Sequence, residues 1–219
     1  MQELHETWIA LQLGGLIILP LTVLAVLALA IMIEKGVLYW RYARLSQDLL
    51  TLVETYGFPW ESLEQKLTLL SKRHYFRRFF EIVLENRNRP SWWTESRAAD
   101  EAQLIEKSLS RRLWILETIV TAAPLLGLMG TIAGMMHSFQ LIGGNGLVNP
   151  IGVTGGVAQA LIATAVGLLI ALISLFGFNF FSRLQSQTLD EMERLGTRLI
   201  DHIRLDQLDN NQDKNHETA

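Results

Sequence analysis

The sequence contains no cysteine, and this absence excludes disulfide bonds, thiolate metal sites and cysteine nucleophiles. It also lacks a P-loop, an HExxH motif and a nucleophile elbow, so we do not expect an enzyme and predict no catalytic residues, no cofactor and no metal. The formal net charge of −3 is small for 219 residues and gives no reason to predict a nucleic-acid partner.

Basic residues are missing from two long parts of the chain. None precedes Lys35, and none lies in the apolar tract 113–182, where Glu117 is the only carboxylate. A helix of about 20 apolar residues is long enough to cross a bilayer. Since 49% of the residues are hydrophobic, we predict an all-α integral membrane protein with three transmembrane helices and long cytoplasmic helical extensions.

The positions of the 19 Lys and Arg residues predict the orientation in the membrane. All of them lie between Lys35 and Arg112 or between Arg183 and Lys214. Cytoplasmic loops carry an excess of Lys and Arg, so both basic zones are predicted to be cytoplasmic and the N-terminus to lie outside. The N-terminal segment is acidic, which favours a membrane anchor over a cleaved signal peptide.

Hydrophobic periodicity and turn signals divide the chain into consecutive helical segments. Ser91 is predicted to cap a helix that continues unbroken into the second crossing, as far as Phe139. The apolar residues of the cytoplasmic region are too few for a separate catalytic domain. The predicted segments, in order, are an outer amphipathic segment (1–10), a first transmembrane helix (11–34), a cytoplasmic helical region (35–112), a second transmembrane helix (113–140), an outer turn (141–150), a third transmembrane helix (151–182), a cytoplasmic helix (183–207) and a disordered tail (208–219).

Polar and small residues interrupt both helices of the apolar tract. Six polar residues fall on a semi-polar stripe of the second helix or on and beside a small-residue stripe of the third: Thr121, Thr131, Ser138, Gln159, Thr164 and Ser174. The small residues predicted to allow close helix packing are Gly127, Gly130, Gly134, Ala160, Ala163 and Gly167. Chemistry alone favours a tightly packed seam in which Thr hydroxyls bond to backbone carbonyls. The alternative is a polar pathway for a small ion.

One requirement limits the second interpretation. A proton relay needs a titratable group near the middle of the membrane. This chain supplies none there. Glu117 lies near the cytoplasmic end of the second helix, where it forms either an exit for the pathway or a structural ion pair. A partner chain would therefore have to provide the carboxylate of a relay.

Two segments of the tract then resemble a known family. APLLGLMGTIAGMMHSF followed by GGVAQALIATAVGLLIA is similar to the MotA/TolQ/ExbB proton-channel family, closest to its ExbB and TolQ branch. The resemblance implies a homopentamer in the bacterial inner membrane, with a periplasmic N-terminus and a cytoplasmic C-terminus. Its second and third helices would line a central pore, and Thr131 and Thr164 fall on the pore threonines of the family.

The resemblance also implies partners. A single-pass ExbD- or TolR-like protein would supply the membrane Asp, and proton flow would energise a TonB- or TolA-like protein. ExbB-like nutrient uptake is favoured over TolQ-like envelope maintenance. The chain departs from the family at Gln159, where many members have Glu. Because Gln cannot titrate, a Na⁺-coupled variant and a non-conducting scaffold for partner helices stay open as alternatives.

Overall fold

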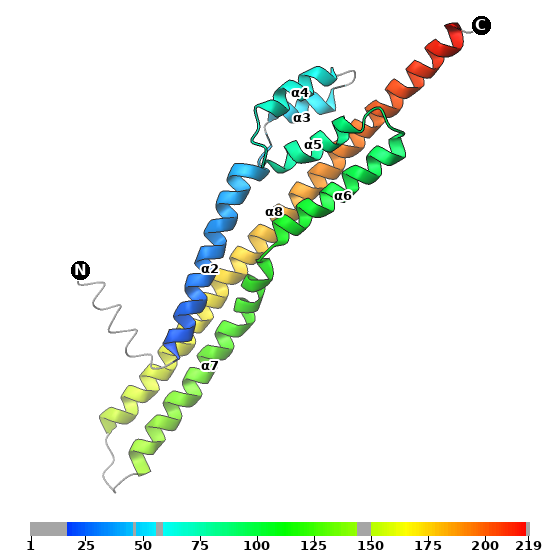
Figure 1. Cartoon of the computed structure of the whole chain (residues 1–219). Helices are drawn as coiled ribbons and strands as arrows, with labels where there is room; N and C mark the ends of the chain where they lie inside the picture. Colours follow the sequence, from blue (N-terminus) through cyan, green and yellow to red (C-terminus); the bar gives the residue numbers. More distant parts are fainter. Residues whose placement is uncertain (1–16, 46, 56–58, 144–149, 218–219) are drawn as a thin grey trace. The chain divides into compact units, whose positions relative to one another are not determined.

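The computed structural model describes residues 17–45, 47–55, 59–143 and 150–217. Every regular element in these residues is a helix (Figure 1). The predicted segment 1–10 and most of the predicted outer turn 141–150 lie outside these residues. The elements are α2 (Ile18–Leu38), a π-helical turn η1 (Tyr39–Ala43), α3 (Gln47–Glu54), α4 (Trp60–Thr68), α5 (Tyr75–Glu85), α6 (Ser91–Ser110), α7 (Leu113–Gly143) and α8 (Pro150–Glu217).

Three helical stretches in the described residues are long and apolar enough to cross a membrane. They lie within Ile18–Ala43, Ser91–Gln140 and Gly152–Leu208. The predicted all-helical class and the number of apolar helices are confirmed for this part of the chain. Pro150 begins α8, a position where proline needs no backbone N–H and its fixed φ suits the first helical turn.

The chain divides into two compact units. One unit, here called the membrane unit, contains residues 1–34 and 112–181, and therefore most of α2, α7 and the first part of α8. The other, here called the peripheral unit, contains residues 35–111 and 182–219. Each unit is described separately below.

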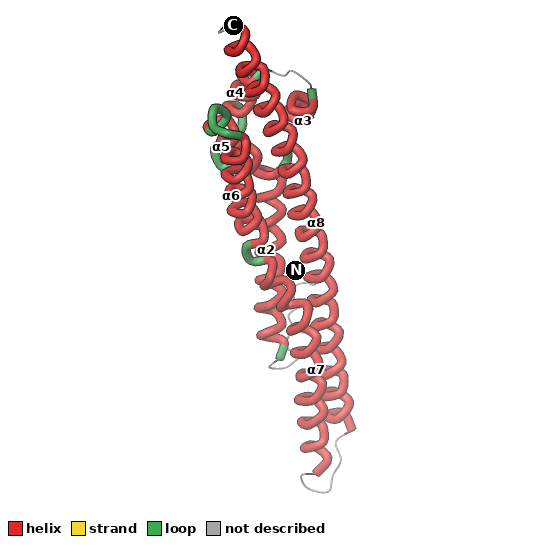
Figure 2. Tube along the Cα trace, turned by 90° about the vertical axis from the view of Figure 1, so that its right-hand side faces the viewer, coloured by secondary structure: helices red, strands yellow, loops and turns green. Residues whose placement is uncertain are grey.

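The core of the peripheral unit is built on the amphipathic helix α5. This helix packs on α6, and Figure 2 shows the two running side by side. Phe76 and Phe80 of α5 are fully buried, and an ion pair of 2.6 Å joins Arg78 to Glu101 of α6. Helix α8 approaches through Gly196, where an added Cβ would lie only 2.8 Å from the Phe79 ring. Apolar burial thus holds these three helices together.

The predicted unbroken helix from Ser91 to Phe139 is interrupted. Helix α6 ends at Ser110, α7 begins at Leu113, and Arg112 between them has a φ of 69°, in the left-handed region. Lys35, only 2% exposed, donates a hydrogen bond of 2.5 Å to the Leu109 carbonyl in the last turn of α6. The end of a helix leaves such carbonyls without an intrahelical donor, so the buried ammonium stabilises the break.

Two other helix ends differ from the prediction. Pro90 occupies the N-cap of α6 and Ser91 is its first helical residue, so the Ser91 side chain does not cap the helix. Helix α8 continues to Glu217, beyond the predicted end at residue 207 and through most of the segment predicted to be a disordered tail. No Gly or Pro occurs after Gly196, so nothing in the local sequence stops the helix.

Candidate functional site

Within the membrane unit, α7 and α8 are antiparallel neighbours whose contact surface consists of small residues (Figures 1 and 2). A Cβ added to Gly130 would lie 2.6 Å from the Cβ of Ala163. One added to Gly134 would lie 2.9 Å from the Cβ of Ala160. We call this surface the α7–α8 seam. At its far end a Cβ on Gly167 would approach a backbone carbonyl oxygen to 2.5 Å, so the helices touch backbone to backbone there.

Thr164 makes a hydrogen bond between the two helices. Its Oγ1 donates to the carbonyl oxygen of Gly127 at 2.8 Å. A Cβ on Gly127 would lie 3.0 Å from the Thr164 Cα, which is tighter than nearly all such contacts. Glycine at position 127 therefore allows the approach that the hydrogen bond requires.

Three other hydroxyls of the predicted pathway, those of Thr121, Thr131 and Ser138, donate to carbonyls of their own helix. Thr131 donates to Leu128 at 2.7 Å, and Thr121 donates to Thr118 at 2.9 Å. Ser138 donates to the Gly134 carbonyl at 2.9 Å and also approaches the Val153 carbonyl of α8 at 3.4 Å. Hydroxyl-to-carbonyl bonds of this kind are those expected of a packed seam, and they satisfy each polar group without water.

The six predicted pathway residues differ in exposure. Thr121 is exposed, Thr131, Gln159 and Thr164 are half-buried, and Ser138 and Ser174 are buried within the chain. Among the described residues the Ser174 hydroxyl has no hydrogen-bond partner. Thr131 and Thr164 each directly follow a member of the Gly130–Ala163 contact. Because the helices are antiparallel, the two threonines lie on opposite sides of that contact, within about one helical turn of each other.

Glu117, the predicted exit residue, is exposed on α7. Arg112, which directly precedes α7, is bonded to Glu34 of α2. In the tract 113–182 the sequence contains no other carboxylate. In the described residues no group of three or more His, Cys, Asp or Glu side chains is arranged to hold a metal ion.

Sequence reasoning missed two titratable residues of the peripheral unit. Lys35 follows an apolar run and reads as the solvated end of a membrane helix, although the structure buries it. His74 is 4% exposed; burial lowers its pKa, and a hydrogen bond to the backbone of Arg44 partly opposes that shift. No sequence pattern distinguishes either residue from an exposed one.

The known proteins that are similar to this chain belong to one family. The family model described as the MotA/TolQ/ExbB proton channel family matches residues 71–194. The biopolymer transport protein ExbB-like 3 of Synechocystis sp. is 33% identical over 176 residues, which cover 78% of this chain and 82% of that protein.

Two further relatives match over shorter segments. The biopolymer transport protein ExbB of Aquifex aeolicus is 41% identical over 95 residues, covering 43% of this chain and 64% of that protein. The Tol-Pal system protein TolQ of Haemophilus influenzae is 38% identical over 76 residues, covering 35% of this chain and 33% of that protein. The family match includes all of α7 and the apolar part of α8, and hence the whole α7–α8 seam.

Proposed function

Because this chain belongs to the MotA/TolQ/ExbB proton channel family, we propose that it is the channel-forming motor subunit of an inner-membrane complex driven by the proton motive force. In this proposal copies of the chain assemble as a homopentamer around a central pore, with the N-terminus periplasmic and the C-terminus cytoplasmic. An ExbD- or TolR-like single-pass protein supplies the titrating carboxylate, and a TonB- or TolA-like protein receives the work.

The observation that carries the proposal is the family match across the α7–α8 hairpin. In this hairpin Thr131 and Thr164 lie within about one helical turn of each other, in an apolar segment that contains no carboxylate deeper than Glu117. A relay through this segment therefore needs a carboxylate from another chain. The small-residue seam supports the same proposal, because it fixes the two helices in register.

Four of the six proposed pathway residues are exposed or half-buried in the single chain, and so are at least partly accessible. Thr121, Thr131, Gln159 and Thr164 meet this condition, and Glu117 would form the cytoplasmic exit of the pathway. Ser138 and Ser174 are buried inside the chain, so their hydroxyls reach a pathway only if the packing of the helices changes. All six belong to the proposal as residues of the proton path or of its immediate support.

Gln159 favours a second candidate function, a non-conducting scaffold that anchors partner helices. Its amide donates and accepts hydrogen bonds but does not titrate at physiological pH. Every threonine discussed above already donates to a backbone carbonyl, as a purely structural seam would require. ExbB-like outer-membrane transport is the branch we favour, with a TolQ-like envelope-maintenance motor as the alternative.

Proton flux into liposomes tests these candidates. The full chain is reconstituted with and without its ExbD- or TolR-like partner, a membrane potential is applied, and acidification of the lumen is recorded. Flux that requires the partner supports the channel. Absence of flux from a complex shown to be assembled supports the scaffold, and replacing external Na⁺ separates sodium from proton coupling.

Threonine variants locate the pathway. Thr131→Val and Thr164→Val are expected to abolish energised transport while the complex still assembles. Thr118→Val is the matched control for Thr131→Val, because Thr118 is also an α7 threonine whose hydroxyl donates to its own helix, at 2.8 Å to Trp114. Normal transport in both pathway variants would contradict the assignment of these threonines to the pore.

A further inference from the structure

The turn between α4 and α5 is attached to the chain that follows the first apolar helix. The Nε2–H of His74 donates to the carbonyl oxygen of Arg44 at 3.1 Å, and the His74 backbone N–H closes the turn on Ser71 at 2.8 Å. His74 is buried, and α5 contacts η1 beside it. This attachment holds two turn residues, Lys72 and Arg73, next to the segment from Arg41 to Arg44.

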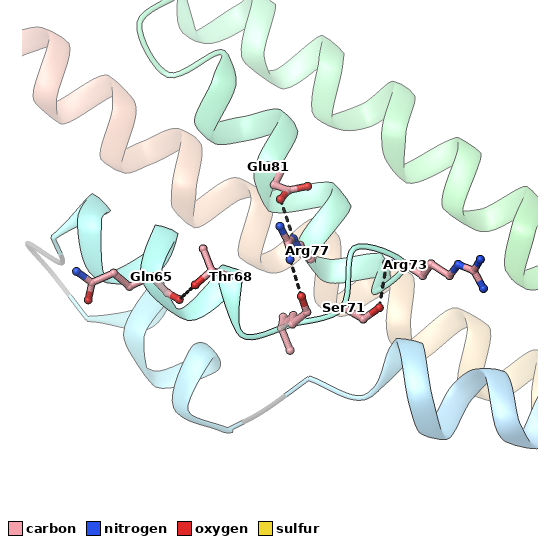
Figure 3. A network of polar contacts seen from close by, with 7 residues as sticks. Gln65, Thr68, Ser71, Arg73, Arg77 and Glu81 are labelled. Carbon is pink, nitrogen blue, oxygen red and sulfur yellow. Dashed lines mark hydrogen bonds and ion pairs between the residues drawn. The ribbon is translucent and has the colours of Figure 1, made fainter.

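Each of these two neighbouring segments carries two exposed cations. We call Arg41, Arg44, Lys72 and Arg73 the basic patch; all four side chains are exposed. In the described part of the chain none of them forms an ion pair, whereas the following arginine, Arg77, is paired with Glu81 at 2.7 Å. Figure 3 shows this difference, since Arg77 turns toward Glu81 and Arg73 extends away from the other labelled side chains. Within the described residues the patch therefore has positive charge that no ion pair neutralises.

Large apolar side chains accompany both halves of the patch. Trp40 directly precedes Arg41 and is 79% exposed, and Leu69 lies at the start of the turn that contains Lys72 and is 85% exposed. An exposed leucine or tryptophan alone needs no explanation. Beside cations at the end of a membrane helix, the combination is that of an interfacial surface, with apolar groups at the acyl boundary and cations among headgroups.

The position of the patch identifies its partner. Arg41 lies in the last turn of the apolar stretch Ile18–Ala43, and Arg44 follows it directly. Charges at this position lie at headgroup depth when the helix crosses a bilayer. Phosphodiester headgroups supply the oxygen acceptors that guanidinium and ammonium groups bind well.

We propose that the basic patch binds the headgroups of anionic phospholipids, and that His74 is the positioning residue that brings its two halves together. The site is distinct from the proposed proton pathway and uses none of its residues. It lets the composition of the bilayer act on the peripheral unit.

Native mass spectrometry of the full chain in mild detergent tests this binding. The protein is mixed with equal amounts of phosphatidylglycerol and phosphatidylcholine of the same acyl chains, and the ratio of the two bound lipids is measured. The wild type is expected to bind phosphatidylglycerol preferentially. A Lys or Arg beside an anionic surface contributes about fivefold to binding, so Lys72→Gln/Arg73→Gln should lower the preference by up to roughly 30-fold.

Arg87→Gln/Arg89→Gln is the matched control, because it also removes two exposed arginines from an interhelical turn of the peripheral unit. This variant should keep the preference. His74→Phe retains all four cations and a ring of similar shape but loses the bond to the Arg44 carbonyl, so it should lower the preference as well. If His74→Phe fails to fold, Lys72→Gln/Arg73→Gln still tests the site, because both of its replaced side chains are exposed.

Three results would overturn the proposal. The first is equal binding of the two lipids by the wild type. The second is an equal loss of preference in both double variants, which would indicate a general effect of charge. The third is displacement of phosphatidylglycerol by glycerol phosphate at similar concentration, which would identify a site for a soluble phosphate rather than for a lipid.

Discussion

The closest approach to a backbone atom in the α7–α8 seam lies at Gly167, and it gives a quantitative prediction for the Gly167→Ala variant. The added methyl carbon would lie 2.5 Å from the Ala123 carbonyl oxygen, whereas ordinary contact begins at 3.4 Å, so the helices must separate by the difference of 0.9 Å. A shift of α8 by that distance lengthens the 2.8 Å bond from Thr164 to the Gly127 carbonyl to about 3.7 Å, beyond hydrogen-bond range.

Gly155→Ala is the matched control in the same helix, because nothing lies within 4 Å of its added Cβ. Both variants gain about 1 kcal/mol of helix propensity. Only Gly167→Ala incurs overpacking of about 1–3 kcal/mol and loses an interhelical hydrogen bond of about 1 kcal/mol. We therefore expect Gly155→Ala to exceed Gly167→Ala in stability by about 2–4 kcal/mol.

The assay is reversible unfolding of both variants in mixed micelles, followed by circular dichroism. Proton flux with the partner is measured in parallel, and Gly167→Ala should reduce it because Thr164 is displaced. Equal unfolding free energies for the two variants would refute the description of the seam as a backbone contact. Equal flux despite unequal stability would refute only the link between the seam and conduction.

Three further predictions concern single polar contacts. Lys35→Met leaves the buried Leu109 carbonyl without its donor and should cost about 1–3 kcal/mol, with faster amide exchange at the end of α6; unchanged exchange would contradict the capping role. Because burial lowers the pKa of His74 below its ordinary 6.5, the unfolded chain binds the proton first. Stability should thus fall as the pH drops below 6.5, by at most about 1.4 kcal/mol per pH unit, and an unchanged pH slope in His74→Phe would exclude this histidine as the cause. Thr164→Ser keeps the bond to Gly127 and should match the wild type, whereas Thr164→Val should lose about 1 kcal/mol; equal stabilities would show that the bond contributes nothing.

The helices were predictable from the sequence because their signals are local. The apolar runs set the three membrane-capable helices, and Pro59 and Pro90 mark interruptions that the chain contains. The break at Arg111 and Arg112 carries no such signal, since neither glycine nor proline is present. It depends on Lys35, which lies far away in the sequence and binds the end of α6.

The candidate site was predictable as a set of residues but not as an arrangement. A helical wheel places Thr121 and Ser138 on one stripe, but it does not say which part of that stripe another helix covers. The register of α7 against α8 decides this, so Ser138 is buried while Thr121 is exposed. The bond from Thr164 to Gly127 is likewise a property of two helices and cannot be derived from either alone.

The antiparallel arrangement of the seam also determines how it forms during synthesis. Contacts near the turn between α7 and α8, such as Ser138 with Gly156, join residues close in the sequence, while the contact of Ala123 with Gly167 joins residues farther apart. Short loops lose the least entropy on closing, so the hairpin zips from the turn toward the opposite end. In this order the bond from Thr164 to Gly127 forms after the contact of Gly134 with Ala160 and before the contact of Ala123 with Gly167.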